Sequence, residues 1–472
     1  MKTKQKVLLV GLGILGGGLT TALWLLKHGA DLTITDTKSK KELASSIKKL
    51  KKYSRQIKFV LGRHRLSDVL KNDLIILNQA VPVLNNKLVD YAIGHRKPVK
   101  KELELFFDNI SQPVIGITGT RGKTTTTLWI HHLLKAKFPE IQVGGNNPDY
   151  PLFSFINKLK KDIPVVLEVP CFQLELPPHK TPYISVITNL YVDHLNRYQT
   201  MKRYAQIKAN IFKYQTNNNY LILNYDNPWT KYFLTFNPKA KMYFTSLKKL
   251  AKKYDGVCLH NNWLVFQLRG RQEKIINVKE FNQKWGLHNT DNLLRAVLIS
   301  KIFNISNNKI KQQIKTLPQI KMRQEIIFED KKYLIINDSA GTSPEATEQV
   351  LARFKNSDLI LITGGTDKNL DFKNLAHAIK KFLPAQNLIL INGSATKKLI
   401  TELNKLSYSL SYNVFETIPE CFIYALSLIK NKHKHIIAFS PGAASFGKFK
   451  NEFDRGEKFN QIVKEIKTKK PR

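Results

Sequence analysis

The sequence predicts an α/β protein of three domains. Its 472 residues exceed what one core normally holds, and short apolar strands alternate with helical stretches along the chain. Two glycine-rich turns each follow a strand and precede a helix. From these observations we expect domains at residues 1–102, 103–319 and 320–472.

The first domain is expected to be a parallel sheet with covering helices. Its predicted strands are 7–10, 32–35, 58–61 and 73–77. The uncharged run Val7–Leu26 is long enough to span a bilayer. However, glycines interrupt it early, and a strand ending in Asp36 follows at once. We therefore predict a βαβ unit and no membrane anchor or signal.

The first glycine turn reads Gly11-x-Gly13-x-x-Gly16, with Asp36 twenty residues further on. Glycines at this spacing allow close approach of a diphosphate, and a carboxylate at the next strand end can accept hydrogen bonds from a ribose. The pattern predicts a Rossmann-like domain. NAD is the obvious ligand, but any nucleotide diphosphate would fit, and a purely structural turn stays open.

The second turn, Gly119-Thr120-Arg121-Gly122-Lys123-Thr124, predicts a nucleoside triphosphate site. Such a turn aims backbone N–H groups at one point, and the following helix N-terminus adds positive potential. Lys123 supplies a mobile cation, and Thr124 or Thr125 a hydroxyl for Mg²⁺. The first glycine of the general P-loop pattern would fall at Ile117, so the match is to a shorter loop. The helix is expected over 128–137.

Further polar residues follow strands of the central domain. Glu168 ends a predicted strand at 165–167, where a carboxylate commonly holds Mg²⁺. His194, after the strand 185–188, fits either a metal ligand or a buried structural histidine. Lys208 lies in a helical stretch, where a lone lysine normally faces solvent. Asn292 could read an adenine edge or cap a helix. Residues 256–278 look antiparallel, which makes the central sheet mixed.

The third domain is expected to be a second Rossmann-like unit. Its predicted strands are 333–336, 359–362, 388–391 and 436–439. Several polar residues stand at the strand ends, which form the edge where open α/β sheets bind ligands. They are Arg323, Asp338, Thr342, Lys368 and Ser445.

The composition narrows the class of partner. The chain has 76 Lys+Arg against 36 Asp+Glu, a net charge of +40. Because the lysines are scattered through every segment, we expect anionic ligands and no nucleic-acid partner. Three widely spaced cysteines form no metal or disulfide pattern, which fits a reducing cytoplasm.

Taken together, the motifs resemble those of the Mur ligases, ATP-dependent amide ligases of peptidoglycan precursor synthesis. The resemblance covers nearly the whole chain and is strongest to the members that add glutamate to UDP-N-acetylmuramoyl-L-alanine. The residues that carry it, in the family's order, are the Gly-Thr-x-Gly-Lys-Thr loop, Glu168, Asn189, Asp193-His194, Lys208, His288-Asn289-x-x-Asn292, Arg323, Asn337-Asp338-Ser339 and Gly364-Gly365.

The resemblance implies a role for each candidate residue. It implies that the first glycine turn holds UDP instead of NAD, and that Lys208 is carbamylated. The implied catalytic residues are Lys123, Glu168, His194 and Lys208, and the implied Mg²⁺ ligands are Thr124, Glu168, His194 and Lys208. The implied ATP contacts are Gly119, Thr120, Arg121, Gly122, Lys123, Thr124, Thr125, Asn292, Arg323 and Asp338. The implied contacts to the UDP substrate are Ile14, Leu15, Asp36, Thr37, Asn146 and His194, and those to glutamate are Thr342, Lys368 and Ser445.

The resemblance further implies a cytoplasmic, monomeric enzyme that forms an acyl phosphate from UDP-N-acetylmuramoyl-L-alanine and ATP. Some positions depart from the family pattern, namely Asn78-Gln79-Ala80, Pro170-Cys171 and Ala340. These departures leave open a ligase with another acceptor, such as a folylpolyglutamate synthase-like enzyme. An NAD-dependent dehydrogenase and a basic nucleic-acid-binding protein are the alternatives from other classes. The glutamate enantiomer does not follow from these residues.

Overall fold

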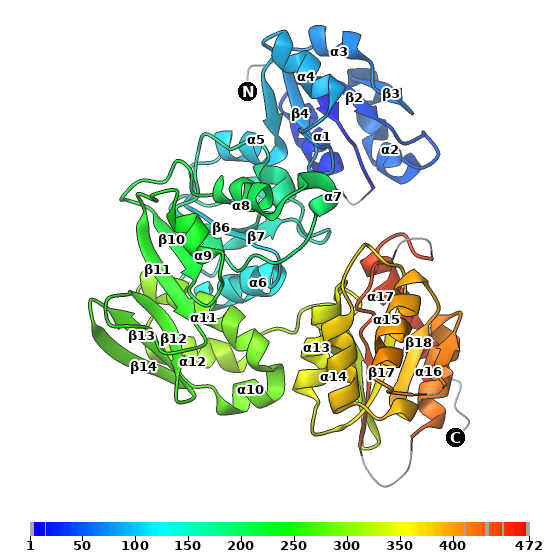
Figure 1. The fold of residues 1–472 in the computed structure, drawn as a ribbon. Coiled ribbons are helices and arrows are strands. Elements are labelled where there is room, and N and C mark those ends of the chain that lie inside the picture. Colours follow the sequence, from blue (N-terminus) through cyan, green and yellow to red (C-terminus); the bar gives the residue numbers. More distant parts are fainter. Residues whose placement is uncertain (1–3, 15, 410, 430–433, 446–447, 469–472) are drawn as a thin grey trace. The chain divides into compact units, whose positions relative to one another are not determined.

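A computed structural model describes residues 4–14, 16–409, 411–429, 434–445 and 448–468 (Figure 1). Within these residues it has three sheets with helices between the strands, and the central sheet is mixed. The expected α/β class with a mixed central sheet is therefore confirmed. The chain divides into two compact units, residues 1–278 with 291–317 and residues 279–290 with 318–472. The boundaries at 102 and 319 stay predictions.

The first sheet is five-stranded and parallel, in the order β3-β2-β1-β4-β5. Its elements are β1 (Lys6–Val10), α1 (Gly17–Lys27), β2 (Asp31–Asp36), α2 (Ala44–Leu50), the 3₁₀ helix η1 (Lys51–Gln56), β3 (Ile57–Leu61), α3 (Leu66–Leu70), β4 (Leu74–Leu77), α4 (Lys87–Gly94), β5 (Val99–Lys101) and α5 (Glu102–Asp108).

The uncharged N-terminal run forms a strand, a turn and a helix, as the βαβ expectation required. Strand β1 ends at Val10 and α1 begins at Gly17. Gly18 lies against backbone, because a Cβ there would stand 2.6 Å from the Leu12 carbonyl oxygen. Among the described residues, no helix is both long and apolar enough to cross a membrane. Since β1 lies between β2 and β4, the glycine turn opens at the point where the strand order reverses.

The central sheet has nine strands in the order β14-β13-β12-β11-β10-β9-β6-β8-β7. Only the pairs β12–β13 and β13–β14 of this sheet are antiparallel. The elements are β6 (Val114–Thr118), α6 (Lys123–Leu134), β7 (Gln142–Gly145), η2 (Ile156–Lys158), β8 (Val165–Glu168), η3 (Cys171–Leu174), β9 (Ile184–Ile187), α7 (Leu195–Tyr198), α8 (Met201–Ala209), β10 (Tyr220–Asn224), α9 (Thr230–Leu234), β11 (Lys241–Ser246), β12 (Gly256–His260), β13 (Trp263–Leu268), β14 (Arg271–Asn277), α10 (Lys279–Trp285), α11 (Leu287–Ile302) and α12 (Asn307–Lys315).

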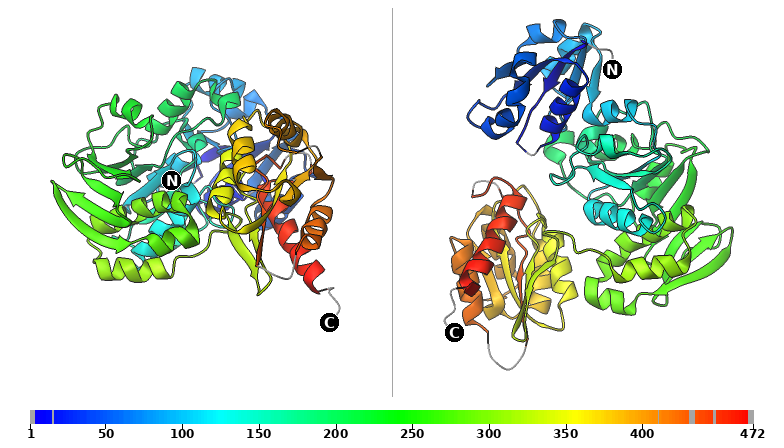
Figure 2. Two further views of the ribbon diagram at one scale, coloured as in Figure 1. Left: turned by 60° about the horizontal axis from the view of Figure 1, so that its bottom comes forward. Right: turned by 180° about the vertical axis from the view of Figure 1, so that it is seen from behind.

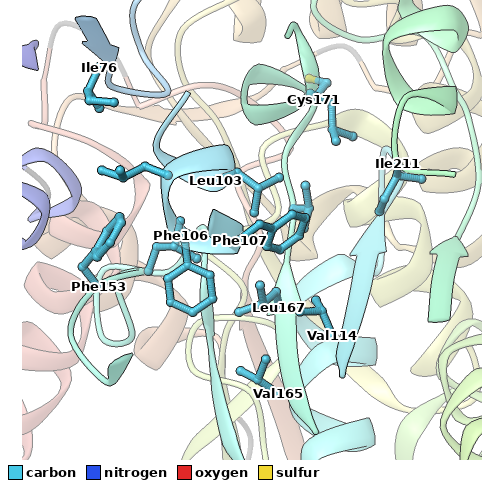
Figure 3. Close-up of a cluster of buried hydrophobic side chains, with 14 of the residues drawn as sticks. Ile76, Leu103, Phe106, Phe107, Val114, Phe153, Val165, Leu167, Cys171 and Ile211 are labelled. Carbon is cyan, nitrogen blue, oxygen red and sulfur yellow. The ribbon is translucent and has the colours of Figure 1, made fainter. Parts of the chain in front are cut away.

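One apolar core joins the first sheet to the central sheet through α5. Phe106 and Phe107 are buried among side chains of both, and Figure 3 shows them near Val114, Val165 and Leu167. The Phe106 ring meets the Phe153 ring edge-on, with centroids 5.6 Å apart. Aromatic side chains of this size bury large apolar areas, so α5 connects the two sheets firmly.

The third sheet has six strands in the order β15-β16-β20-β17-β18-β19, with only β15 antiparallel to its neighbour. Its elements are β15 (Glu325–Glu329), β16 (Tyr333–Asn337), α13 (Pro344–Arg353), β17 (Asp358–Gly364), α14 (Lys373–Phe382), η4 (Ala385–Asn387), β18 (Leu388–Ile391), α15 (Ser394–Lys405), β19 (Asn413–Phe415), α16 (Ile418–Ser427), β20 (His435–Phe439) and α17 (Glu452–Thr468).

Both faces of the third sheet are buried, which is typical of parallel sheets with helices on either side. Along β16, Leu334 and Ile336 face the core that contains α13, α14 and α15. Tyr333 and Ile335 face the opposite core, to which α16 and α17 contribute. Figure 2 shows α17, in red, against this sheet. The Rossmann-like expectation for this part is confirmed.

Candidate active site

The triphosphate turn lies between β6 and α6, near the middle of the parallel part of the central sheet. Gly122 has φ +77° and is the N-cap of α6, which begins at Lys123. The expected helix start at Leu128 was wrong, because the β-branched run 124–127 disfavours a helix locally. Starting at Lys123 brings the helix N-terminus directly to the turn, which favours anion binding there.

Thr188 and Asn189, which directly follow β9, fix the phosphate turn through hydrogen bonds to the backbone of Arg121. Asn189 accepts a hydrogen bond from the Arg121 N–H at 2.9 Å, and its amide donates to the Arg121 carbonyl at 3.2 Å. The Thr188 hydroxyl donates to the same carbonyl at 2.7 Å. A Cβ at Gly119 would collide with the Thr188 hydroxyl, so only glycine fits there.

Lys123, Thr126 and Asn292 fix the start of α6. The Lys123 ammonium donates to the Thr120 carbonyl at 2.9 Å, back across the turn. The Thr126 hydroxyl donates to Asn292 at 3.1 Å, and a Cβ on Gly122 would collide with the same Asn292 oxygen. Asn292 therefore ties α11 to α6. Its predicted contact with ATP stays a prediction, as does that of Thr124 or Thr125.

Lys208 is buried beneath the phosphate turn. The expectation that a lone lysine in this helical stretch faces solvent was therefore wrong. Its ammonium donates to the Gly119 carbonyl at 2.7 Å and lies 4.6 Å from the centre of the Tyr204 ring. Burial, and to a lesser degree the nearby Lys123 charge, lower the pKa of Lys208 to about 8. The structure thus brings two of the predicted catalytic residues, Lys123 and Lys208, to the same turn.

Glu168 and His194 follow neighbouring strands of the central sheet. Glu168 ends β8, is 4% exposed, and accepts a hydrogen bond from the Asn146 amide at 3.5 Å. His194 adopts a left-handed backbone, with φ +54°, and starts α7. Its ring meets those of Phe172 and Tyr204 edge-on, with centroids 4.8 and 6.0 Å away. Among the residues that the structure describes, no group of three or more His, Cys, Asp or Glu could hold a metal ion.

Asp36 is committed to the first glycine turn. One carboxylate oxygen accepts from the N–H groups of Leu12 and Gly13, at 2.9 and 3.0 Å, and the other accepts from Lys38 N–H at 2.9 Å. Ile14 and Thr37 are exposed beside it, whereas Leu15 lies outside the described residues. The structure therefore gives Asp36 a role in shaping the turn. Its predicted contact with UDP stays a prediction.

A small pocket within the first unit lies between the start of α1 and the ends of strands β7 and β8 of the central sheet. Its lining includes Gly17, Gln79, Asn146, Glu168 and Pro170. Another lining residue is Glu102, a buried carboxyl that accepts hydrogen bonds from Thr21, Asn78 and Gln173. Burial raises the pKa of Glu102, while these hydrogen bonds oppose the rise. This small pocket therefore lies between Gly17, which follows the first glycine turn, and the predicted catalytic carboxylate Glu168.

The predicted residues of the second unit lie at the carboxyl edge of the third sheet. Asp338 accepts from the Ser440 hydroxyl at 2.7 Å and from Gln324 N–H at 3.0 Å. Burial raises its pKa to about 6, against these hydrogen bonds and the charge of Arg323. Thr366 and Ala444 pair through their backbones, which brings the segments of Lys368 and Ser445 together. Thr342 follows the neighbouring strand β16.

Comparisons with known proteins identify the family of the chain. The Mur ligase middle domain model matches residues 117–300, from the phosphate turn to α11. The UDP-N-acetylmuramoylalanine–D-glutamate ligase of Borreliella afzelii (strain PKo) is 35% identical over 458 residues, with 97% of each chain covered. That of Roseiflexus sp. (strain RS-1) is 32% identical over 466 residues, covering 97% of this chain and 98% of its own. The chain belongs to the Mur ligase family.

Solved structures support the same fold. The UDP-N-acetylmuramate-alanine ligase MurC of Thermotoga maritima aligns with a TM-score of 0.61 at 20% identity, over 98% of this chain and 100% of its own. The MurF ligase of the same organism in complex with ADP aligns with a TM-score of 0.58 at 16% identity, over 98% and 96%. The family expectation, and with it the expectation of an ATP-dependent ligase, is confirmed. The role of each site residue stays a prediction.

Sequence reasoning missed one residue of this Mur ligase that supports the phosphate turn. Arg295 on α11 is completely buried. Its guanidinium donates to the Thr188 carbonyl at 2.7 Å and to the Asp291 carboxylate at 2.9 Å. An Asp–Arg pair four residues apart on a helix is usually a surface pair, so the spacing alone gave no reason to place it in the core.

Replacing Arg295 with methionine should lower the free energy of unfolding by about 3–5 kcal/mol, because Asp291 would lose its partner. The double variant Arg295→Met with Asp291→Leu should recover most of that loss, since no unpaired charge remains. Urea unfolding followed by tryptophan fluorescence measures this, because Trp129 of α6 is fully buried in the folded protein. Ser300→Ala on the same helix is the control and should cost about 1 kcal/mol or less. A single variant as stable as the wild type would contradict the expectation.

Proposed function

We propose that this Mur ligase joins D-glutamate to UDP-N-acetylmuramoyl-L-alanine with ATP, in peptidoglycan precursor synthesis in the cytoplasm. The observation that carries the proposal is the full-length similarity to relatives that bear this name. The phosphate turn supports it independently, because its fixed glycine backbone and helix N-terminus suit a triphosphate. The enzyme would act as a monomer.

The first unit would hold the nucleotide acceptor and ATP. UDP would lie at the first glycine turn, near Ile14 and Thr37. The muramoyl-alanine end would lie toward Asn146, Glu168 and His194. ATP would take the second turn, with Asn292 on the same side. Each of these assignments is what the family resemblance implies. For Ile14, Thr37, Asn146, Glu168 and His194 it is also supported by their position at or just after the carboxyl end of a strand, where such folds bind ligands.

Magnesium fits these residues only together with the triphosphate. Glu168 and Thr124 offer oxygen ligands, but the described residues include no all-protein cage. Mg²⁺ usually keeps several waters and binds through one or two carboxylates plus substrate phosphates. When bound, it would neutralise charge on the transferring phosphoryl group. Lys208 fits beside a cation only if carbamylation turns its ammonium into a carboxylate-like group.

The reaction would take two steps. An oxygen of the alanyl carboxylate attacks the γ-phosphorus, the bond to the bridging oxygen breaks, and ADP leaves with the electron pair. The glutamate amine then attacks the acyl carbon, loses a proton, and inorganic phosphate leaves. Phosphoryl transfer depends mainly on positioning and charge neutralisation, which Lys123 and the turn supply. Holding the amine against the acyl phosphate contributes roughly 7–11 kcal/mol toward the second barrier.

Glutamate would be held by residues of the second unit. Lys368 carries the charge that a dicarboxylate needs, and the hydroxyls of Thr342 and Ser445 offer hydrogen bonds. Arg323 and Asp338 would contact ATP. The departure from the family pattern at Ala340 concerns its side chain. The contact between Ala340 and Arg323 is made by the Ala340 backbone carbonyl, which accepts a hydrogen bond from the Arg323 guanidinium at 3.4 Å, so this contact does not depend on the side chain at position 340.

A ligase with another acceptor is the second candidate, and one observation favours it. The departures from the family pattern include Gln79 and Pro170, and both line the pocket of the first unit. Different residues in the lining of this pocket would change which acceptor binds and would leave ATP binding unchanged.

Phosphate release by the purified protein tests the proposal. With ATP and Mg²⁺ present, we expect release only when UDP-N-acetylmuramoyl-L-alanine and D-glutamate are both added, and none with L-glutamate. Release that persists when the nucleotide substrate is omitted would contradict the proposal. Release that requires D-glutamate but prefers another acceptor, such as a folate, would instead support the second candidate.

A further inference from the structure

Glu175 is a buried carboxylate surrounded by hydrogen-bond donors. Arg197 of α7 donates to both of its oxygens, at 2.8 Å through Nη2. The Tyr198 hydroxyl, the Val83 N–H and the Lys101 ammonium lie 3.0, 3.1 and 3.2 Å from the same carboxylate. Burial would raise the pKa of Glu175, but the hydrogen bond from Arg197 and the charge of Lys101 hold the pKa below its ordinary value. Glu175 is therefore an anion at a point where residues of β5 and α7 converge.

The segment 80–83, which lies beyond the end of β4, is held by the same charged groups. Arg197 donates to the Ala80 and Val81 carbonyls, at 3.2 Å each. Lys101 also donates to the Val81 carbonyl, at 2.6 Å. Since all of these hydrogen bonds reach the backbone, they fix the position of the segment independently of its side chains.

This segment lies against the first glycine turn. A Cβ at Gly11 would stand 3.0 Å from a methyl group of Val81 and 3.0 Å from the Asn78 Cβ. Gln79, in the same stretch, lines the small pocket that also includes Glu168. A shift of the segment would therefore move the residues next to the predicted UDP turn together with part of the lining of this pocket.

Arg197 also contacts the surroundings of His194. Its guanidinium lies over the Phe172 ring, 4.5 Å from the ring centre. Phe172 in turn meets the His194 ring edge-on, with centroids 4.8 Å apart, and the Arg197 N–H donates to the His194 carbonyl at 3.0 Å. One residue thus contacts both the segment beyond β4 and the ring that packs against the predicted catalytic histidine.

The charges of this cluster contribute geometry more than stability. Buried ion pairs are costly to desolvate, and apolar side chains of similar volume often replace them without loss of stability. A guanidinium, by contrast, presents its donors in a rigid planar fork. Arg197 therefore fixes the Glu175 carboxylate and the two carbonyls of the segment in one arrangement.

We propose that Arg197 is a positioning residue for the acceptor, because it fixes segment 80–83 relative to His194. The inference rests on the proposed function, in which the muramoyl-alanine end of the acceptor lies toward His194, and adds a residue to it. Arg197 acts through the segment and through Phe172, and the two chemical steps are unchanged. Such positioning keeps the acceptor carboxylate in line with the γ-phosphorus, where a misplacement of about 1 Å can cost about 10²-fold in rate.

Steady-state kinetics of Arg197→Met test the assignment. This variant keeps an apolar stem over Phe172, and Lys101 still pairs with Glu175, so we expect it to fold. It should lower kcat/KM for UDP-N-acetylmuramoyl-L-alanine by about 10²-fold and change KM for ATP by less than about threefold. Arg197→Lys should recover only part of the loss, because its ammonium keeps the charge and lacks the planar fork. A loss of stability alone would not separate the two substrates in this way.

Phe172→Leu tests the contact with His194 separately. It removes the ring between Arg197 and His194 and leaves the hydrogen bonds to segment 80–83 in place. It should therefore lower kcat by about two- to fivefold, the value of one cation–π contact, and leave KM for the UDP substrate unchanged. An unchanged kcat in this variant would overturn the part of the inference that concerns His194.

The matched control is Arg203→Ala on α8. The Arg203 guanidinium donates to the Gln199 side chain at 3.4 Å. This variant removes an arginine from the helix after α7 and should leave kcat and both KM values unchanged.

Two results separate the inference from the proposed function. A wild type that neither binds UDP-N-acetylmuramoyl-L-alanine in isothermal titration nor releases phosphate with it would refute the proposed function and the inference with it. An active wild type whose Arg197→Met variant keeps kcat/KM for this substrate within about threefold would overturn the inference alone. Equal losses for ATP and for the UDP substrate would also overturn it, because they indicate general damage to the fold. Titration with a non-hydrolysable ATP analogue checks folding, and Arg197→Gln replaces a variant that does not bind the analogue.

Discussion

Replacing Lys123 with alanine is expected to lower phosphate release by at least about 10³-fold while leaving binding of the UDP substrate unchanged. Lys123 is the first residue of α6, and its ammonium reaches back across the turn to the Thr120 carbonyl. From that position it can follow the phosphate charge through the transfer, which depends on charge neutralisation. The first glycine turn is built by its own backbone and Asp36, so the loss of Lys123 does not reach it.

Two measurements on one preparation check this expectation. Phosphate release gives turnover, and isothermal titration with UDP-N-acetylmuramoyl-L-alanine gives binding. Lys135→Ala is the control, because Lys135 is an exposed lysine just after the other end of the same helix. It should keep the wild-type rate. Near-normal turnover of Lys123→Ala would show that the triphosphate binds elsewhere.

Most of the fold could be predicted because strands buried on both faces leave continuous apolar runs. Strands β1, β18 and β20 are such runs, and each was expected within a residue or two. Strands β5 and β19 were missed because each has three residues, with few buried side chains. The start of α6 was missed because the threonines at 124–127 favour strands. The helix nevertheless begins at Lys123, directly after the turn residue Gly122.

The site was predictable where spacing alone carries the chemistry. The glycines of the phosphate turn are such a case, because Gly119 and Gly122 adopt backbone conformations and close contacts that only glycine accepts. The burial of Lys208 was not predictable from its own segment, which is polar. Tyr204 lies one turn earlier on the same helix, but the Gly119 carbonyl is a partner that only the tertiary fold brings near. Arg295 was missed for the same reason.

Replacing Lys208 with methionine is expected to lower turnover by about 10³-fold and to abolish carbamate formation. The segment buries this lysine completely, and burial lowers its pKa to about 8. At pH 8 about half of such amines are neutral, against well under about 1% at an ordinary pKa of 10.5. Carbon dioxide reacts with the neutral amine, so Lys208 is poised to become the anionic carbamate that the family resemblance implies.

Labelling with ¹³C-bicarbonate, followed by carbon NMR, measures the carbamate directly. The wild type should show a carbamate signal that grows from pH 7 to pH 9, because the neutral amine increases as pH rises through the pKa near 8. Lys208→Met should lack the signal, and Lys202→Met, an exposed lysine on the same helix, should keep it. A wild type without the signal at pH 9 would mean that Lys208 acts as an ammonium. Its hydrogen bond to the Gly119 carbonyl would then be its role, and the phosphate turn would have one more cation than the family mechanism assumes.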